Sequence, residues 1–235
     1  MSVRIILTCP SHPGNIGATA RAMKNMGLSE LYLVAPKDFP CHDATVRASG
    51  ADDILEKAQC VDSLEDALAG CHKVFATSAR SRRLEWPLCT PREAAEKIKS
   101  LGAHKSAIVF GRESSGLTND ELSLCHYHIH IPTIDEFSSL NLSQAVQVIV
   151  YELFVAISGE TPVVIDDEDV LASADELHGL TEHLRQTMTA VQFLNPNQPR
   201  KLMLRLRRLF QRADTTKTEV NILRGFLTAI DQRID

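Results

Sequence analysis

The chain has 235 residues, of which 44% are hydrophobic and 5% aromatic, and its formal net charge at pH 7 is −5. This length and composition are ordinary for a globular protein with one ample domain, or with one domain and a smaller appendage. No stretch approaches the roughly 20 consecutive apolar residues of a membrane-spanning helix, and the first apolar run is too short for a signal peptide, which excludes a membrane protein and a secreted one.

Residues 1–158 alternate between strand-like and helix-like segments. Short runs of β-branched and other apolar residues predict strands at 4–7, 31–34, 74–76, 107–110 and 128–131. Apolar periodicity predicts helices over 15–26 and over 140–157. Three further helices are predicted to follow capping-box sequences that begin at Ser63, Thr90 and Thr118. The last helix is so apolar that we expect it to be packed on most sides. The alternation predicts an α/β domain with a mostly parallel sheet.

The composition changes after this domain. Residues 159–182 carry eight acidic residues and no Lys or Arg, and their Gly and Pro predict an exposed acidic linker that acts as a solvated spacer. Residues 200–235 carry nine basic and four acidic residues, a distribution that favours a nucleic-acid partner. Helices are predicted over 175–191, 200–213 and 219–233. We therefore expect an α/β domain over 1–158, an acidic linker over 159–174 and a helical C-terminal extension over 175–235.

The first motif that carries chemistry runs from Ser11 to Arg21, SHPGNIGATAR. Its Pro and two glycines are expected to form a turn that leads into a helix, and the free N–H groups and positive dipole of a helix N-terminus suit an anion such as an RNA phosphate. The alternative is a plain strand–loop–helix junction with a surface arginine at Arg21.

The second motif is FGRESSGL, residues 110–117, directly after a predicted strand. Its two glycines let the backbone approach a ligand or adopt positive φ. In the alternative interpretation, Arg112 and Glu113 simply pair with each other. The motif is not the G-x-G-x-x-G of dinucleotide-binding domains, and the chain has no G-x-x-x-x-G-K-[ST] loop, so a nucleotide-binding α/β domain is disfavoured.

The third motif places Ser138, Ser139 and Asn141 at the entry to the long apolar helix. One of these small polar residues would cap the helix in any protein, but capping does not require all three. The absence of a G-x-S-x-G elbow makes a serine hydrolase a weak interpretation.

Metal-ligand residues form no recognisable pattern. His126, His128 and His130 alternate along a predicted strand, but no carboxylate or Cys pattern completes a site, so we predict no metal. The six cysteines include no C-x-x-C pair, which favours reduced thiols in a cytoplasmic protein.

Taken together, the motifs resemble the SPOUT methyltransferases, the trefoil-knot class, and most closely their bacterial tRNA ribose methyltransferases. The resemblance rests on SHPGNIGATARAMKNMGL, TSARSR, FGRESSGLTNDEL and EFSSLNLSQAVQVIVYEL, which cover residues 1–158 in order. In the tail, LRRLF and NILRG resemble the C-terminal extension of that family. Each motif alone is only moderately specific, whereas all of them in register are highly specific.

This resemblance implies a SPOUT-type, mostly parallel sheet with a C-terminal trefoil knot, and a homodimer whose active sites lie at the subunit interface. It implies that S-adenosyl-L-methionine binds bent in a pocket made by the knot. The cofactor-binding residues carried over from the family are Thr77, Ser78, Ala79, Gly111, Ile131, Ser138, Ser139 and Leu140.

The implied reaction is 2′-O-methylation of a ribose in tRNA, at cytidine or uridine 32 of the anticodon loop. The resemblance implies that Arg21 activates and orients the hydroxyl. An arginine is an unlikely base, because the pKa of a guanidinium is so high that the group stays protonated. Ser139 and Asn141 would help to hold the ribose or shape the pocket. The RNA-binding residues we expect are Arg80, Arg82, Arg83, Lys201, Arg205, Arg208 and Arg212.

Alternatives remain open at this point. In the tail helix, the four expected RNA-binding residues from Lys201 to Arg212 lie on one stripe, and Leu202, Leu206 and Leu209 lie on another. This pattern is equally typical of an amphipathic helix that docks on the core. The enzyme could act on another tRNA site or on rRNA, because a fold does not fix its substrate. A non-catalytic RNA-binding scaffold of the same fold is the rival from a different class.

Overall fold

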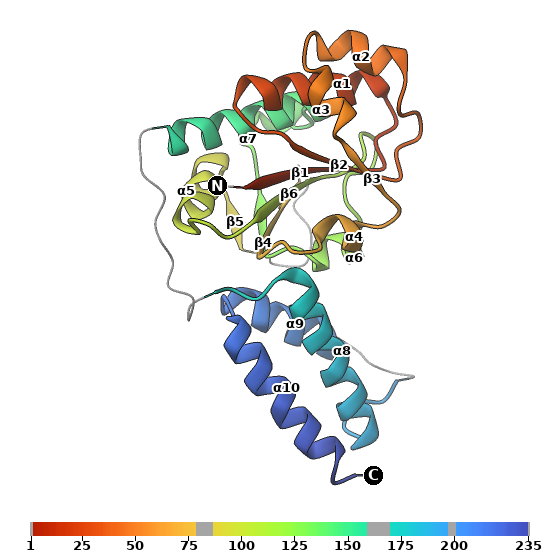
Figure 1. Ribbon diagram of the computed structural model, residues 1–235, viewed down its shortest axis with the longest axis vertical. Coiled ribbons are helices and arrows are strands. Elements are labelled where there is room, and N and C mark those ends of the chain that lie inside the picture. Colours follow the sequence, from red (N-terminus) through yellow and green to blue (C-terminus); the bar gives the residue numbers. More distant parts are fainter. Residues whose placement is uncertain (1, 79–86, 159–169, 197–200, 235) are drawn as a thin grey trace.

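The computed structural model describes residues 2–78, 87–158, 170–196 and 201–234. In these residues one sheet of seven parallel strands runs in the order β3-β2-β1-β6-β4-β7-β5 (Figure 1). The strands are β1 (Val3–Thr8), β2 (Glu30–Val34), β3 (Gln59–Val61), β4 (Lys73–Thr77), β5 (Leu88–Cys89), β6 (Ser106–Phe110) and β7 (Tyr127–Ile129). The predicted α/β class and parallel sheet are confirmed, and the short strands β3 and β5 are additions to the prediction.

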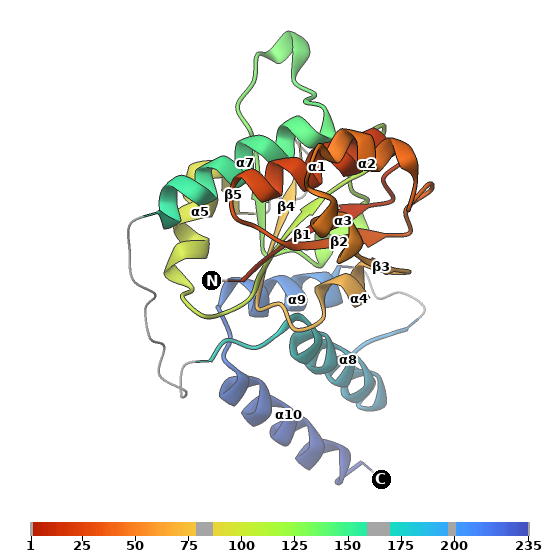
Figure 2. The ribbon, with the colours of Figure 1, turned by 45° about the horizontal axis from the view of Figure 1, so that its top comes forward.

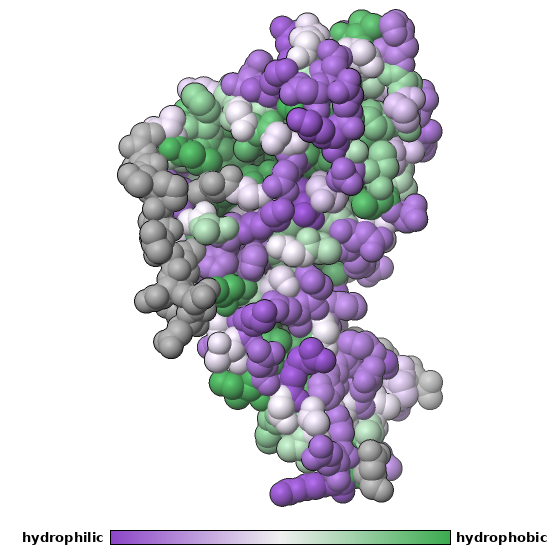
Figure 3. Space-filling view, viewed as in Figure 1, coloured by the Kyte–Doolittle hydropathy of each residue, from purple (hydrophilic) through white to green (hydrophobic). Residues whose placement is uncertain are grey.

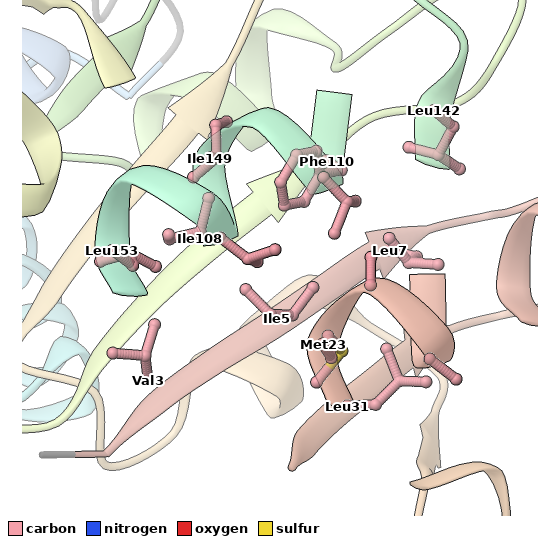
Figure 4. Packing of buried hydrophobic residues seen from close by; sticks show 14 of the residues in the cluster. Val3, Ile5, Leu7, Met23, Leu31, Ile108, Phe110, Leu142, Ile149 and Leu153 are labelled. Atoms are coloured by element: carbon pink, nitrogen blue, oxygen red, sulfur yellow. The ribbon is translucent and has the colours of Figure 1, made fainter. Parts of the chain in front are cut away.

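Two layers of helices cover the sheet. One face carries α1 (Pro13–Asn25), α2 (His42–Ala48), α3 (Asp52–Glu56), α5 (Pro91–Ser100) and α7 (Leu142–Ile157), and the other carries α4 (Leu64–Leu68) and α6 (Asn119–Ser123) (Figure 1). Figure 4 shows Ile5 of β1 and Ile108 of β6 facing Ile149 of α7. Burial of both faces explains why the central strands are continuous apolar runs rather than alternating ones.

Helix α7 is less enclosed than its sequence suggests. Val148, Tyr151, Phe154 and Val155 are 37%, 52%, 46% and 47% exposed, so the expectation of packing on most sides is wrong for this chain by itself. Figure 3 shows hydrophobic colour over this end of the molecule, near α7 and α5. Helix α7 therefore presents a flank of large apolar side chains to the solvent.

The C-terminal extension consists of α8 (Ala174–Ala190), α9 (Leu202–Arg212) and α10 (Lys217–Asp231), which share a small core of their own. It lies on the side of the sheet that carries α4 and α6 (Figure 1). The backbone N–H of Ala174 donates to the carbonyl of Cys71 at 2.6 Å, and Lys73 forms an ion pair with Asp214. The predicted domain boundaries, at residues 158 and 175, stay predictions. The predicted trefoil knot also stays a prediction.

The segment between β7 and α7 projects from the body of the molecule and carries the 3₁₀ helix η1 (Asp135–Phe137) (Figure 2). Ile134 and Phe137 on this arm are 68% and 76% exposed. Among the described residues, we find no helix that is long and apolar enough to cross a membrane.

Candidate active site

A pocket lies where three neighbouring strands end. Thr77 closes β4, Phe110 closes β6 and Ile129 closes β7, and all three line the pocket. The carboxyl ends of parallel strands meet at one edge of a sheet, which is where ligands bind in open α/β folds. Residues 111–117, residues 138–140 and the first turns of α7 complete the walls.

The structure brings the predicted cofactor residues together. They come from four separate segments of the chain, and every one that lies within the described residues lines this pocket. These residues are Thr77, Ser78, Gly111, Ile131, Ser138, Ser139 and Leu140. Ala79 lies outside the described residues.

The loop after β6 is held closed by its own backbone. The N–H of Arg112 donates to the carbonyl of Gly116 at 3.2 Å, and the N–H of Gly116 donates back at 2.9 Å. Gly116 has a φ of +70°, in the left-handed region that favours glycine. A Cβ on Gly111 would lie 2.3 Å from the carbonyl carbon of Gly116, so only glycine fits this wall of the pocket.

The alternative interpretation, in which Arg112 pairs with Glu113, is wrong. Arg112 donates through both terminal nitrogens to the carboxylate of Glu121 in α6, each at 2.9 Å. Glu121 also accepts from the backbone N–H of Thr118 at 2.7 Å, as part of the capping box of α6. Partial burial opposes ionisation of Glu121, but the bonds from Arg112 and Thr118 win and lower the pKa of its carboxyl. The loop is therefore anchored to α6.

Glu113 points the other way, to the turn before α1. Its carboxylate accepts from the N–H and the hydroxyl of Ser11 at 3.1 and 2.9 Å, from the N–H of His12 at 3.1 Å and from the side-chain amide of Asn15 at 3.0 Å. Partial burial raises the pKa of Glu113, but these donors outweigh it and hold the pKa at about 2. The turn before α1 thus holds a carboxylate of the protein itself, and the binding of an RNA phosphate to this helix N-terminus stays a prediction.

Asn141 joins the third motif to the first. Its side-chain oxygen accepts from the N–H of Ser143 at 2.9 Å and so caps α7, as any small polar residue could. Its amide also donates to the side-chain oxygen of Asn15 at 3.0 Å. Asn15 therefore links Asn141 to Glu113, and the three motifs meet in one hydrogen-bonded chain. The sequence analysis did not single out Asn15 or the role of Glu113, because their partners lie about a hundred residues away along the chain.

Arg21 is exposed on α1 and does not line the pocket of its own subunit. Ala18, one turn earlier, lines a shallow hollow together with Asn15 and Asn141. Residues three apart share a face of a helix, so Arg21 lies on the same face of α1 as Ala18. Within the described part of the chain, no hydrogen bond or ion pair is recorded for Arg21, which leaves its guanidinium available to a ligand.

The predicted RNA-binding residues divide into two groups. Arg80, Arg82 and Arg83 lie outside the described residues. On α9, or at its start, Lys201, Arg205 and Arg212 are exposed and Arg208 is half-buried. The leucine stripe docks only in part, since Leu209 is 46% exposed. Arg207 and Gln211, which the sequence analysis did not single out, make the contacts with the sheet domain instead.

Comparison with known proteins agrees with this geometry. The family model of the SpoU rRNA Methylase family matches residues 2–151, and that of the tRNA methyltransferase TrmJ, C-terminal domain, matches residues 175–235. The tRNA (cytidine/uridine/adenosine-2′-O-)-methyltransferase TrmJ of Pseudomonas aeruginosa is 51% identical, over 96% of this chain and 92% of the relative. The tRNA (cytidine/uridine-2′-O-)-methyltransferase TrmJ of Klebsiella pneumoniae is 48% identical, over 99% and 97%.

A solved structure, that of TrmJ from Z. mobilis ZM4, is 34% identical and has a TM-score of 0.87, covering 98% of this chain and 100% of that chain. The parallel sheet, the pocket at its carboxyl edge and the family model over 2–151 define the class: an RNA methylase of the SpoU type. Within that class, the chain belongs to the TrmJ family of methyltransferases.

Proposed function

We propose that the protein transfers a methyl group from S-adenosyl-L-methionine to the 2′-hydroxyl of a ribose in tRNA, at cytidine or uridine 32 of the anticodon loop. The observation that carries the proposal is the assembly of seven expected cofactor residues, from four separate segments, around one pocket. The relatives from P. aeruginosa and K. pneumoniae are named for tRNA 2′-O-methylation of cytidine and uridine, and the first also for adenosine.

The pocket fits the cofactor chemically. Ile131, Leu140 and Leu142 offer apolar surface to an adenine ring, and Thr77 and Ser138 bring hydroxyl groups to the same walls. The ionised carboxylate of Glu113 also lines the pocket and suits a cationic ligand. When bound, S-adenosyl-L-methionine supplies an electrophilic methyl group on a sulfonium.

The residues of the chain have the task of placing the ribose. The reaction requires that the ribose hydroxyl be oriented toward the methyl group that the cofactor would supply, and that its proton pass to an acceptor. The guanidinium of Arg21 orients the hydroxyl together with the adjacent RNA phosphate. Ser139 and Asn141 hold the ribose beside the pocket.

A homodimer completes the site in this proposal. The exposed flank of α7 and the arm with Ile134 and Phe137 give a second copy two apolar surfaces to cover. Because Arg21 lies outside the pocket of its own subunit, we assign it to the pocket of the other one. The basic residues on α9 grip the tRNA backbone without reading its sequence.

The test is methyl transfer from labelled S-adenosyl-L-methionine into unmodified tRNA, with nuclease mapping of the product and an Arg21→Ala variant alongside. We expect a labelled 2′-O-methyl nucleotide at position 32, and a loss on the order of 100-fold or more in the variant with unchanged cofactor binding. Substrates with each of the four bases at position 32 test the base range, including adenosine.

Near-normal turnover by Arg21→Ala would remove that residue from the mechanism. Label at another tRNA position would move the site but keep the chemistry. If cofactor binds and no tRNA is labelled, ribosomal RNA becomes the substrate to test, and failure there favours the non-catalytic scaffold.

A further inference from the structure

The helix α6 touches both the cofactor pocket and the C-terminal extension, although it has only five residues, Asn119–Ser123. In the middle of α6, Glu121 holds Arg112 of the pocket loop through two hydrogen bonds of 2.9 Å. At the C-terminal end of α6, Ser123 accepts two hydrogen bonds from α9. A single rigid turn of helix thus lies between the pocket and the extension.

The contact between α6 and α9 is polar and directional. Arg207 donates through Nη1 to the hydroxyl of Ser123 at 3.1 Å, and Gln211 donates through Nε2 to the carbonyl of Ser123 at 3.2 Å. The hydroxyl of Ser123 donates in turn to the carbonyl of Asp120 at 2.6 Å. Ser123 and Gln211 are 8% and 7% exposed, so these bonds are shielded from water. We call Ser123, Arg207 and Gln211 the α6–α9 joint.

The joint is poorly suited to stabilise the fold. The side-chain oxygen of Gln211 is buried and has no hydrogen-bond partner among the described residues, and burial lowers the pKa of the Arg207 guanidinium. An apolar contact of the same size would avoid the cost of burying these groups. Two directional bonds from one face of α9 hold the rotation of α9 about its own axis.

That rotation decides where the basic residues point. Arg207 and Gln211 are four residues apart and lie on one face of α9. At about 100° per residue, Arg205, Arg208 and Arg212 lie about 100° to 160° round the helix from Arg207. Fixing the docked face therefore fixes the direction of the basic one.

We propose that Arg207 and Gln211 are positioning residues, which hold the basic face of α9 at the angle that delivers the target ribose to the cofactor pocket. The inference rests on the proposed function and gives a role to the tail motif LRRLF, residues 206–210. The joint faces the sheet domain, where Ser123 accepts one hydrogen bond from Arg207 and one from Gln211. It acts on the rate of transfer and leaves the strength of RNA binding to the basic face.

The experiment compares Arg207→Met and Gln211→Met with Arg205→Met in the full-length enzyme. The joint variants should bind tRNA with unchanged Kd, while their single-turnover rate at saturating tRNA falls on the order of 10-fold to 100-fold, because the ribose is misplaced. Arg205→Met should do the reverse, raising Kd with little change in that rate. Arg207→Lys, which keeps a donor on a similar stem, should recover part of the rate.

A loss of the extension's fold is detected by helical circular dichroism. Ser123→Ala provides a milder test, since it removes the acceptor for Arg207 and the bond to Asp120 but keeps the carbonyl that accepts from Gln211. An unchanged single-turnover rate in folded Arg207→Met and Gln211→Met would overturn the proposal, as would a loss confined to Kd. An inactive wild-type enzyme would instead contradict the proposed function, so failure of the proposed function is distinguished from failure of this inference.

Discussion

At the scale of single residues, the carboxylate of Glu113 carries a charge that the fold depends on. The donors from Ser11, His12 and Asn15 hold its pKa at about 2, against an ordinary value of 4.5. A carboxyl whose pKa is lower in the folded state stabilises that state above its unfolded pKa, and this stabilisation is lost as the pH falls toward the folded pKa. The window for the loss is therefore about pH 5 to about pH 2.

We predict that Glu113→Gln lowers the free energy of unfolding at neutral pH by about 1–2 kcal/mol. This value is at the low end of the range for hydrogen bonds to a charged group, because the carboxylate is only partly buried. The difference from the wild type should shrink as the pH falls through the same window. Urea unfolding at a series of pH values measures it, and Glu96→Gln, at an exposed position on α5, is the matched control. A difference that does not vary with pH would show that shape, and not charge, is what Glu113 supplies.

At the scale of elements, the loop between β6 and α6 is closed by backbone contact at Gly111. We predict that Gly111→Ala costs about 1–3 kcal/mol and weakens cofactor binding, because its Cβ would lie 2.3 Å from the carbonyl carbon of Gly116 and must push the loop open. Calorimetric titration with S-adenosyl-L-methionine and thermal unfolding measure the two effects.

Gly225→Ala in α10 is the control for this substitution. A Cβ there meets no atom within 4 Å, so the change should stabilise the protein by about 0.5–1 kcal/mol through the unfolded chain. Unchanged cofactor affinity in Gly111→Ala would mean that the loop has more room than its backbone geometry implies.

The elements also show what the sequence can predict and where it stops. Strands such as β1 and β6 are buried on both faces, so their apolar runs reveal them, whereas β3 and β5 are too short to do so. The polar side chains of the motifs were visible, but their partners were not, because Asn15 and Asn141 meet only through the topology of the sheet. Apolar composition alone could not separate the core side of α7 from its exposed flank, since both consist of the same residue types.

At the scale of the whole molecule, the separation of Arg21 from the pocket makes the two-subunit active site testable without a structure of the dimer. We mix two inactive variants. Arg21→Ala keeps an intact pocket, and Ser139→Tyr keeps Arg21 but fills the pocket with its ring. In a mixed dimer, the intact pocket and the intact arginine come from different subunits, so one of the two sites is whole.

Random exchange makes half of the dimers mixed, and each has one complete site, so methyl transfer should recover to about a quarter of the wild-type rate. The recovery needs subunit exchange, and it should therefore vanish when each variant is cross-linked as its own dimer before mixing. If Arg21 served the pocket of its own subunit, each site of the mixed dimer would lack either Arg21 or an open pocket, and mixing would recover no methyl transfer. The doubly substituted chain mixed with wild type distinguishes the two arrangements. With shared sites, each such mixed dimer has no complete site, whereas with self-contained sites the wild-type subunit stays active.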